Sequence, residues 1–427
     1  MIDGTWVQIK RGSKDVLGWI EKNQSFQCKD THYQTYYFYT IEPNRSKEPI
    51  LIYAKDIQSV GESLLDEDYH CLQLLALHFN DKKWFEELGI IVKHYVKNEG
   101  FNWGGIMYSI GLDIGTTSAK AVLFSKANEA LDSCEAYYPL IQEQPGYAEQ
   151  DAEVVFEACL LALEQLHMKH KITNQITAFG LSAAMHSLLA VDENGKPLIN
   201  ALIWADNRSA AIINELKQTD FYQDFYKRTG TPIHPMSWIG KLKWFNQNNQ
   251  VVFKKAAKFI SIKEYICQKL FGEYVVDEAI AGGTGVYHLT TKQWDQDILD
   301  YIGVNREKLS VIVPTTYEFT KRTSRGKQAL PYSNCRFIIG ASDGVLANVG
   351  TFALTSDVAT VTIGTSGAVR MHTKQPSTDS EMRTFCYALT EDDWIAGGAT
   401  NNGGIALQWY IDQFAKGEKQ WILLRKH

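Results

Sequence analysis

Residues 108–124 read YSIGLDIGTTSAKAVLF, and residues 358–373 read VATVTIGTSGAVRMHT. In each stretch, two alternating apolar runs rich in β-forming residues flank a turn of Gly, Thr and Ser, which is typical of a β-hairpin. Small residues at such a turn let backbone N–H groups approach a phosphate, and the hydroxyls add further donors. The repeat therefore predicts two similar domains that face one another across a nucleoside triphosphate.

Two charged residues flank the first turn. A single hairpin of this kind is equally well explained as an ordinary tight turn. The residues beside it therefore help to decide whether it binds phosphate. Asp113 lies just ahead of the turn, where a carboxylate can hold Mg²⁺ directly or through water. Lys120 follows the turn and is either a cation for phosphate or a solvated lysine at a strand end. The carboxylate and the repeat together favour phosphate binding.

Six motifs carry a resemblance to a known family. They are DIGTTSAK (113–120), GLSAAMHSL (180–188), IWADNRS (203–209), GASDGVLANVG (340–350), TIGTSGA (362–368) and GGATNNGG (397–404). In order and spacing they resemble the FGGY carbohydrate kinases over about residues 107–415, and within that family they are most similar to the gluconokinase group. The resemblance implies an α/β, actin-like (ribonuclease H-like) ATPase fold with ATP and Mg²⁺ as cofactors.

Asp343 is the best candidate for a catalytic base. It follows an apolar strand and precedes a helix, so its carboxylate is expected at the carboxyl end of a strand, where ligands gather in α/β sheets. From the residues alone, an N-cap aspartate is an equal alternative. The resemblance implies that this Asp accepts the proton of the attacking hydroxyl.

The resemblance also implies contacts for the nucleotide. The hairpin turns and a later Gly-rich turn would supply them, with Asp113 as the metal ligand as well. The implied contacts are Asp113, Gly115, Thr116, Thr117, Ser118, Lys120, Gly364, Thr365, Ser366 and Gly398. For the later turn around Gly398, a plain connection between a strand and a helix is an equal alternative.

An acceptor site is expected from polar and aromatic residues that follow predicted strands. Trp supplies a flat wall, Asp accepts from hydroxyls, and Arg or His donates to a carboxylate. A lone Trp is more often a core residue, but the W-A-D-N-R cluster favours a site. The residues that the resemblance implies are Met185, His186, Trp204, Asp206 and Arg208, and His234 is added from a Pro-containing loop.

Composition limits the class of protein. The 427 residues are 45% hydrophobic and 22% charged, which is ordinary for a globular protein of two or three domains. A net charge of −6 argues against nucleic acid as a partner. We expect no membrane segment and no signal peptide, and the unpatterned cysteines indicate reduced thiols in a cytoplasmic protein. The expected partner is a small-molecule sugar or sugar acid, and a homodimer is left open.

Three domains are expected. Residues 1–106 match nothing in the family, and they contain two predicted strands (36–41 and 49–54) and two predicted helices (62–79 and 83–97), so a small α+β extension is expected. The bases that can encode residues 103–107 can form a ribosome-binding site before a start codon. We therefore expect Met107 to begin the kinase-like part, and a Gly-rich linker is the alternative.

The remaining domains alternate strands and helices. Helices are expected at 151–169, at 219–230 with its end at Gly230, at 237–247 and after residue 400, and a third short strand at 392–399 leads into the last of these. Residues 107–352 are expected to form the complete sugar-binding domain, and residues 353–427 the start of a truncated nucleotide-binding domain. The tail 416–427 leaves the family's pattern, and the implied adenosine-binding segment is absent.

These features favour an ATP-dependent kinase that phosphorylates a sugar hydroxyl or a sugar acid, with gluconate as acceptor and 6-phosphogluconate as product. A xylulokinase-like ketose kinase is one alternative. Because of the truncation, an inactive remnant that only binds sugar is another. A sugar-responsive regulator lacks support, since the sequence shows no helix-turn-helix signal and no basic patch.

Overall fold

The chain divides into two compact units, Met1–Trp103 and Gly104–His427. The computed structural model describes residues 108–170, 175–363 and 367–400, and, by backbone alone, 6–11, 14–28, 31–40, 50–53 and 57–60. The helices expected at 62–79, at 83–97 and beyond residue 400 lie outside these ranges, as do Gly364, Thr365 and Ser366.

The first unit contains a five-stranded antiparallel sheet in the order β4-β3-β2-β1-β5. The two strands predicted from the sequence are confirmed as β3 and β4. The other three strands were not predicted from the sequence. The bounds are Trp6–Arg11 (β1), Lys14–Cys28 (β2), Thr31–Thr40 (β3), Ile50–Tyr53 (β4) and Ile57–Val60 (β5).

The second unit is built on a six-stranded mixed sheet in the order β18-β19-β10-β6-β7-β8. The predicted first hairpin is confirmed as β6 and β7, and β10 lies parallel to both β6 and β19. The bounds are Tyr108–Ile114 (β6), Ser118–Ser125 (β7), Ala130–Tyr137 (β8), Ile176–Ala183 (β10), Glu318–Phe319 (β18) and Arg336–Ser342 (β19).

Helices cover this sheet. The predicted amphipathic helix is α3 (Ala152–His170), which packs on β7 and β8 through a continuous apolar core. Helix α8 (Ile262–Phe271) adds to the same core. It begins with a capping box between Ser261 and Glu264 and ends at Gly272, whose φ of 81° suits glycine.

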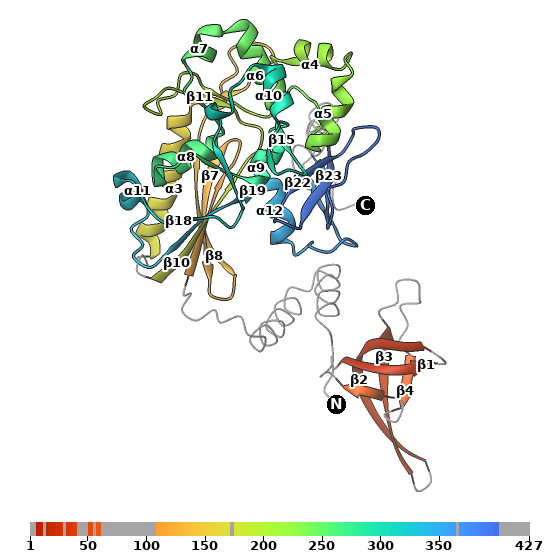
Figure 1. Ribbon diagram of the computed structural model, residues 1–427. Coiled ribbons are helices and arrows are strands. Elements are labelled where there is room, and N and C mark those ends of the chain that lie inside the picture. The colour runs from red at the N-terminus through yellow and green to blue at the C-terminus, as the bar shows by residue number, and fades with distance from the viewer. Residues whose placement is uncertain are drawn as a thin grey trace, which may run out of the picture. The chain divides into compact units, whose positions relative to one another are not determined.

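A second core lies among the helices at one end of the unit, which Figure 1 shows in green. These helices are α4 (Ala210–Leu216), α5 (Phe221–Thr229), α6 (Trp238–Asn248), α7 (Gln250–Lys255) and α10 (Gln296–Ile302). The apolar stripe of α6 packs Trp238 against Trp294 with stacked rings. The sequence predicted α5 and α6, and α5 ends at Gly230 as expected.

Short elements connect these layers. They are β9 (Glu149–Gln150), β11 (Leu189–Val191), β12 (Ala201–Leu202), β13 (Lys258–Ile260), β14 (Val275–Asp277), α9 (Glu278–Gly283), β15 (Tyr287–His288), β16 (Gln293–Trp294), η3 (Arg306–Lys308), β17 (Val311–Val313) and α11 (Ser324–Ala329).

A second, four-stranded antiparallel sheet has the order β20-β21-β23-β22. The predicted second hairpin is confirmed as β20 and β21, and the predicted third strand as β23. Helix α12 contacts both β19 and β21 (Figure 1), so it lies between the two sheets. The bounds are Ala359–Ile363 (β20), Gly367–Thr373 (β21), Phe385–Ala388 (β22), Trp394–Thr400 (β23) and Asp343–Gly350 (α12).

Candidate active site

The turn between β6 and β7 is rigidly held. Gly115 N–H donates to Ser118 O at 2.9 Å, and the Tyr138 hydroxyl donates to Gly115 O at 2.7 Å. In the described part of the chain, the N–H groups of Thr116 and Thr117 have no protein acceptor. Two unused donors on a fixed turn are suited to a phosphate oxygen.

The side chains beside this turn differ in whether they already have hydrogen-bond partners. Ser182 donates to Asp113 Oδ1 at 2.7 Å, which orients that carboxylate. Lys120 lies directly opposite Asp113 in the hairpin and is exposed. The Ser118 hydroxyl donates to Glu135 Oε1 at 2.5 Å, so in this structure it is not available to a nucleotide.

Asp343 is the first residue of α12, directly after β19. The helix cap is Ser342, whose Oγ accepts from Val345 N–H, so the alternative of an N-cap role for Asp343 is wrong. Near the end of β19, Gly340 has a φ of 66°, and a Cβ there would lie 1.9 Å from Leu181 O. Only glycine allows this irregularity, which sets the path of the strand toward Asp343.

The environment of Asp343 raises its pKa. The side chain is reached by solvent, but it lies among enough protein atoms that desolvation raises the pKa of its carboxyl to about 6. The negative charge of Asp113 adds to this rise, whereas the Gly344 N–H, Arg370 and Lys263 oppose it. A carboxyl with a pKa near 6 is ionised at neutral pH and still basic enough to accept a proton.

A pocket lies beside the first turn, at the carboxyl ends of β6 and β10. Trp204 forms part of its wall with 37% of the residue exposed, and its Nε1–H donates to Thr116 Oγ1 at 3.1 Å. This bond joins Trp204, the expected wall of the acceptor site, to the turn between β6 and β7. The lining residues are Ile114, Gly115, Thr116, Gln150, Ala183, Ala184, Met185, Ser187, Ile203, Trp204 and Ile262.

Met185 connects this pocket to the start of α12, where Asp343 lies. Its Sδ lies 3.2 Å from the position that a Cβ on Gly283 would occupy, and its Cε lies 3.1 Å from that position on Gly344. Larger residues at either glycine would therefore displace Met185. The side chain of Met185 thus packs between the end of α9 and the start of α12.

His186 is buried in a left-handed conformation, with a φ of 68° that is uncommon for a residue other than glycine. Its Nδ1 lies 2.7 Å from Gly283 O, which accepts the ring proton, and burial lowers the pKa of the imidazole to about 3. The ring is therefore neutral, and Nε2 carries a lone pair. The structure changes the expected chemistry of His186: it can accept from a hydroxyl, but it cannot donate to a carboxylate through Nε2.

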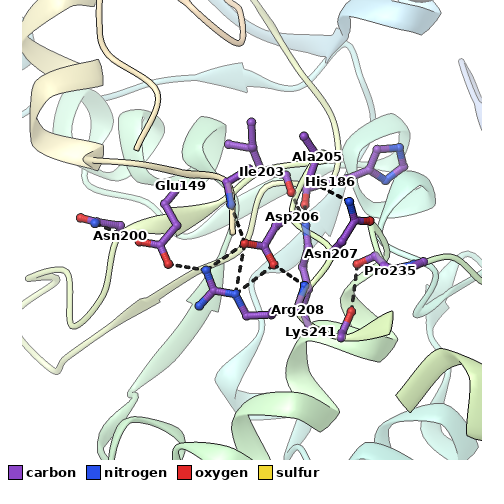
Figure 2. Close-up of polar contacts among 12 residues, drawn as sticks. Glu149, His186, Asn200, Ile203, Ala205, Asp206, Asn207, Arg208, Pro235 and Lys241 are labelled. Atoms are coloured by element: carbon purple, nitrogen blue, oxygen red, sulfur yellow. Dashed lines mark hydrogen bonds and ion pairs between the residues drawn. The ribbon is translucent and has the colours of Figure 1, made fainter. Parts of the chain in front are cut away.

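Asp206 and Arg208 are engaged with each other. Asp206 is fully buried and accepts from the Arg208 guanidinium and from Ala148 N–H (Figure 2). The same guanidinium bonds to Glu149 and lies 3.7 Å from the centroid of the Tyr147 ring. This network holds the segment that carries Trp204 against the segment around Ala148. We therefore expect both charged residues to act on the acceptor indirectly, by positioning Trp204.

Of the remaining predicted contact residues, His234 and Gly398 lie in the described part of the chain, and neither lines the pocket. His234 is exposed, its Nδ1 accepts from Met236 N–H, and burial of part of the ring lowers its pKa. Gly398 lies in β23 opposite Val369, with open space beside it. Gly364, Thr365 and Ser366 lie outside the described residues.

Lys241 and Arg370 are a buried and a half-buried cation that were not singled out in the sequence. Lys241 is fully buried, donates to His186 O at 2.6 Å and to Ile203 O at 2.9 Å, and has its pKa lowered to about 7 by burial. It lies on the apolar stripe of α6, and a charge at such a position could have been noticed. Arg370, on β21, reaches the start of α12 and gave no signal in the strand pattern.

The described residues include no cluster of three or more His, Cys, Asp or Glu that could enclose a metal ion. Mg²⁺ is commonly held by one or two carboxylates together with substrate phosphates and water. Asp113, oriented by Ser182 and adjacent to the phosphate turn, fits that pattern. No helix among the described residues has the length and apolar character needed to cross a bilayer. The cysteines described, all without a disulfide, are Cys134, Cys159, Cys267, Cys335 and Cys386.

The sheet order, the helix that begins with Asp343 and the two hairpins define the actin-like (ribonuclease H-like) class of α/β fold. The chain belongs to the FGGY family of carbohydrate kinases, whose N-terminal domain model matches residues 108–350.

Three similar proteins lie within this family. The gluconokinase of Bacillus subtilis (strain 168) is 42% identical over 312 residues, which cover 73% of this chain and 61% of that protein. The crystal structure of gluconate kinase from Lactobacillus acidophilus is 37% identical, with a TM-score of 0.71 over 73% of this chain and 64% of that one. The ligand-bound xylulose kinase structure from the same organism is 38% identical, with a TM-score of 0.70 over 72% of this chain and 63% of that one. The chain therefore spans about three fifths of the length of these relatives.

Proposed function

We propose that this chain carries the acceptor site and the general base of an ATP-dependent sugar-acid kinase that converts gluconate to 6-phosphogluconate. The observation that carries the proposal is Asp343 at the start of α12, whose pKa is raised to about 6 by desolvation and by the charge of Asp113, just ahead of the first turn. Similarity to gluconokinases supports gluconate as the acceptor. A xylulose-like ketose is the second candidate, because a xylulose kinase structure is equally similar.

The proposed reaction is a single phosphoryl transfer. Asp343 accepts the proton of the acceptor hydroxyl, whose oxygen forms a bond to the γ-phosphorus while the bond to the ADP oxygen breaks. The free N–H groups of Thr116 and Thr117 would contact phosphate oxygens. Mg²⁺ at Asp113 would neutralise part of the phosphate charge. His186 would accept from an acceptor hydroxyl, and Trp204 would cover one face of the carbon chain.

Binding of the acceptor and turnover test this proposal separately. We expect titration calorimetry of the full chain to detect gluconate and to give a weaker signal with xylulose. A coupled assay with ATP and Mg²⁺ should detect ADP release that depends on gluconate. Binding without ADP release would identify the chain as a sugar-binding remnant. If neither sugar binds, the proposed acceptor site is wrong.

The proposal also predicts a pH dependence. Asp343 must be ionised to accept a proton, and its pKa is raised to about 6. The ratio kcat/KM for gluconate should therefore be half its maximum near pH 6, fall as the pH decreases further, and level off about one unit above pH 6. Initial rates between pH 4.5 and pH 8 measure this limb. A profile that stays flat down to pH 5 would contradict the assignment of Asp343.

Cellular location and assembly remain predictions. We place the enzyme in the cytoplasm, where ATP is available, and a homodimer can be tested by light scattering.

A further inference from the structure

Arg370 occupies an unusual position in the second sheet. It lies on β21 between Thr360 and Gly397 of the neighbouring strands, and its Nη1 donates to Thr362 Oγ1 at 2.8 Å. A Cβ on Gly397 would lie 2.2 Å from Val369 O and 3.0 Å from Phe385 Cζ, so the structure is closely packed beside the arginine. The Nε atom of Arg370 is buried and has no hydrogen-bond partner within the described residues.

The guanidinium lies at the start of α12. Its Nε and Nη2 are 3.3 and 3.4 Å from the position that a Cβ on Gly344 would occupy. The N-terminus of a helix carries a partial positive charge, which disfavours a cation there. A guanidinium in this place therefore needs a compensating negative charge, and the residue before Gly344 is Asp343.

Three charged groups act on Asp343 from the elements around it. Asp113 on β6 repels its negative charge, and Lys263 on α8 and Arg370 on β21 attract it. The buried Tyr387 hydroxyl on β22 is also affected by the charges of Arg370 and Asp343, and burial raises its pKa well above the usual range, so it stays neutral.

Of the two cations, Lys263 is already used. It forms a buried ion pair with Asp277 at 2.7 Å and donates to Ala341 O at 3.0 Å. Arg370 forms no hydrogen bond to a carboxylate among the described residues, so it acts on Asp343 through its charge, and its buried Nε is left without a partner. Arg370 is therefore the cation that is free to compensate Asp343.

We propose that Arg370 is a positioning residue that holds the Asp343 side chain at the start of α12 as the charged general base. The role of Asp343 as a base rests on the proposed kinase function, whereas its pairing with Arg370 rests on the geometry. Since Arg370 belongs to the second hairpin and Asp343 to the first domain, the charge of the base depends on contact between the two sheets.

A double-mutant cycle tests the pairing without turnover. The variants are Arg370→Gln, Asp343→Asn and the combination, and the midpoint of urea unfolding is measured for the full chain at pH 8 and at pH 4. Arg370→Gln should lower the midpoint at pH 8, and by clearly less in the Asp343→Asn background. At pH 4, below the pKa of about 6, Asp343 is protonated and the coupling should vanish. An equal effect of Arg370→Gln in both backgrounds at pH 8 would overturn the inference.

Kinetics distinguish this inference from the proposed function. In Arg370→Gln, the acid limb of kcat/KM should move to higher pH by about one unit, and Arg370→Lys should restore it in part, because it keeps the charge. Arg383→Gln is the matched control, since Arg383 pairs with Asp379 on an exposed loop, and it should leave the limb in place. If the acid limb of kcat/KM stays in place in Arg370→Gln, the inference would be refuted, but the proposed kinase function would stand. If the cycle shows coupling but no variant turns over gluconate, the pairing of Arg370 with Asp343 would stand and the proposed kinase function would be refuted.

Discussion

Asp343→Asn is expected to lower the turnover of gluconate by at least about 100-fold and to change gluconate affinity by less than about threefold. A general base acts in the transition state, and an amide cannot accept the proton. The Asn Oδ1 can still accept the Gly344 N–H that Asp343 Oδ1 accepts at 2.6 Å, so the start of α12 should remain intact. Coupled ADP release and titration calorimetry measure the two quantities.

Stability provides the control for this substitution. The pKa of Asp343 is raised in the folded protein, so its charged form is disfavoured by folding, and this penalty is present above pH 6 and absent below pH 4. Asp343→Asn should therefore raise the melting temperature at pH 8 and leave it nearly unchanged at pH 4. Asp357→Asn, at an exposed carboxylate just ahead of β20, should leave turnover unchanged and should not raise the melting temperature. A loss of turnover under about tenfold would exclude Asp343 as the base.

Arg208→Met is expected to destabilise the protein by about 3 kcal/mol. The guanidinium is 6% exposed and bonds to the fully buried Asp206 and to Glu149. Its removal leaves two carboxylates without their cation, which is costlier than losing the pair as a whole. Arg208→Lys should restore little, since an ammonium cannot bond both carboxylates in the same geometry or stack on Tyr147. The shift in the urea unfolding midpoint measures both effects.

An exposed ion pair supplies the matched comparison. Arg336 bonds to Glu318 at the surface, with 62% of the arginine side chain exposed, so Arg336→Met should cost less than about 1 kcal/mol. Gluconate affinity should fall in Arg208→Met, because Trp204 loses its support. Loss of affinity with unchanged stability would instead indicate that Arg208 contacts the acceptor directly.

Patterns within short segments of the sequence were enough to predict local elements of the fold. The hairpins at 108–124 and 358–373, the strand that ends before Asp343 and the helix that ends at Gly230 were predicted, because apolar alternation and turn residues act within a few positions of the chain. The family motifs also predicted the class of fold. Strand β22 was missed, since Phe385–Ala388 is buried throughout and shows no alternation.

The contacts of the predicted site residues depend on the three-dimensional fold. Asp206 and Arg208 look like ligands in the sequence, but the fold brings Glu149 and Tyr147 to them from about 60 residues away, and that environment occupies them. The proton on His186 Nδ1 depends on Gly283 O, and the pKa of Asp343 depends on desolvation and on the charges of Asp113 and Arg370. Burial and charge act between residues that are distant in the chain, and no pattern within a segment records which of them meet.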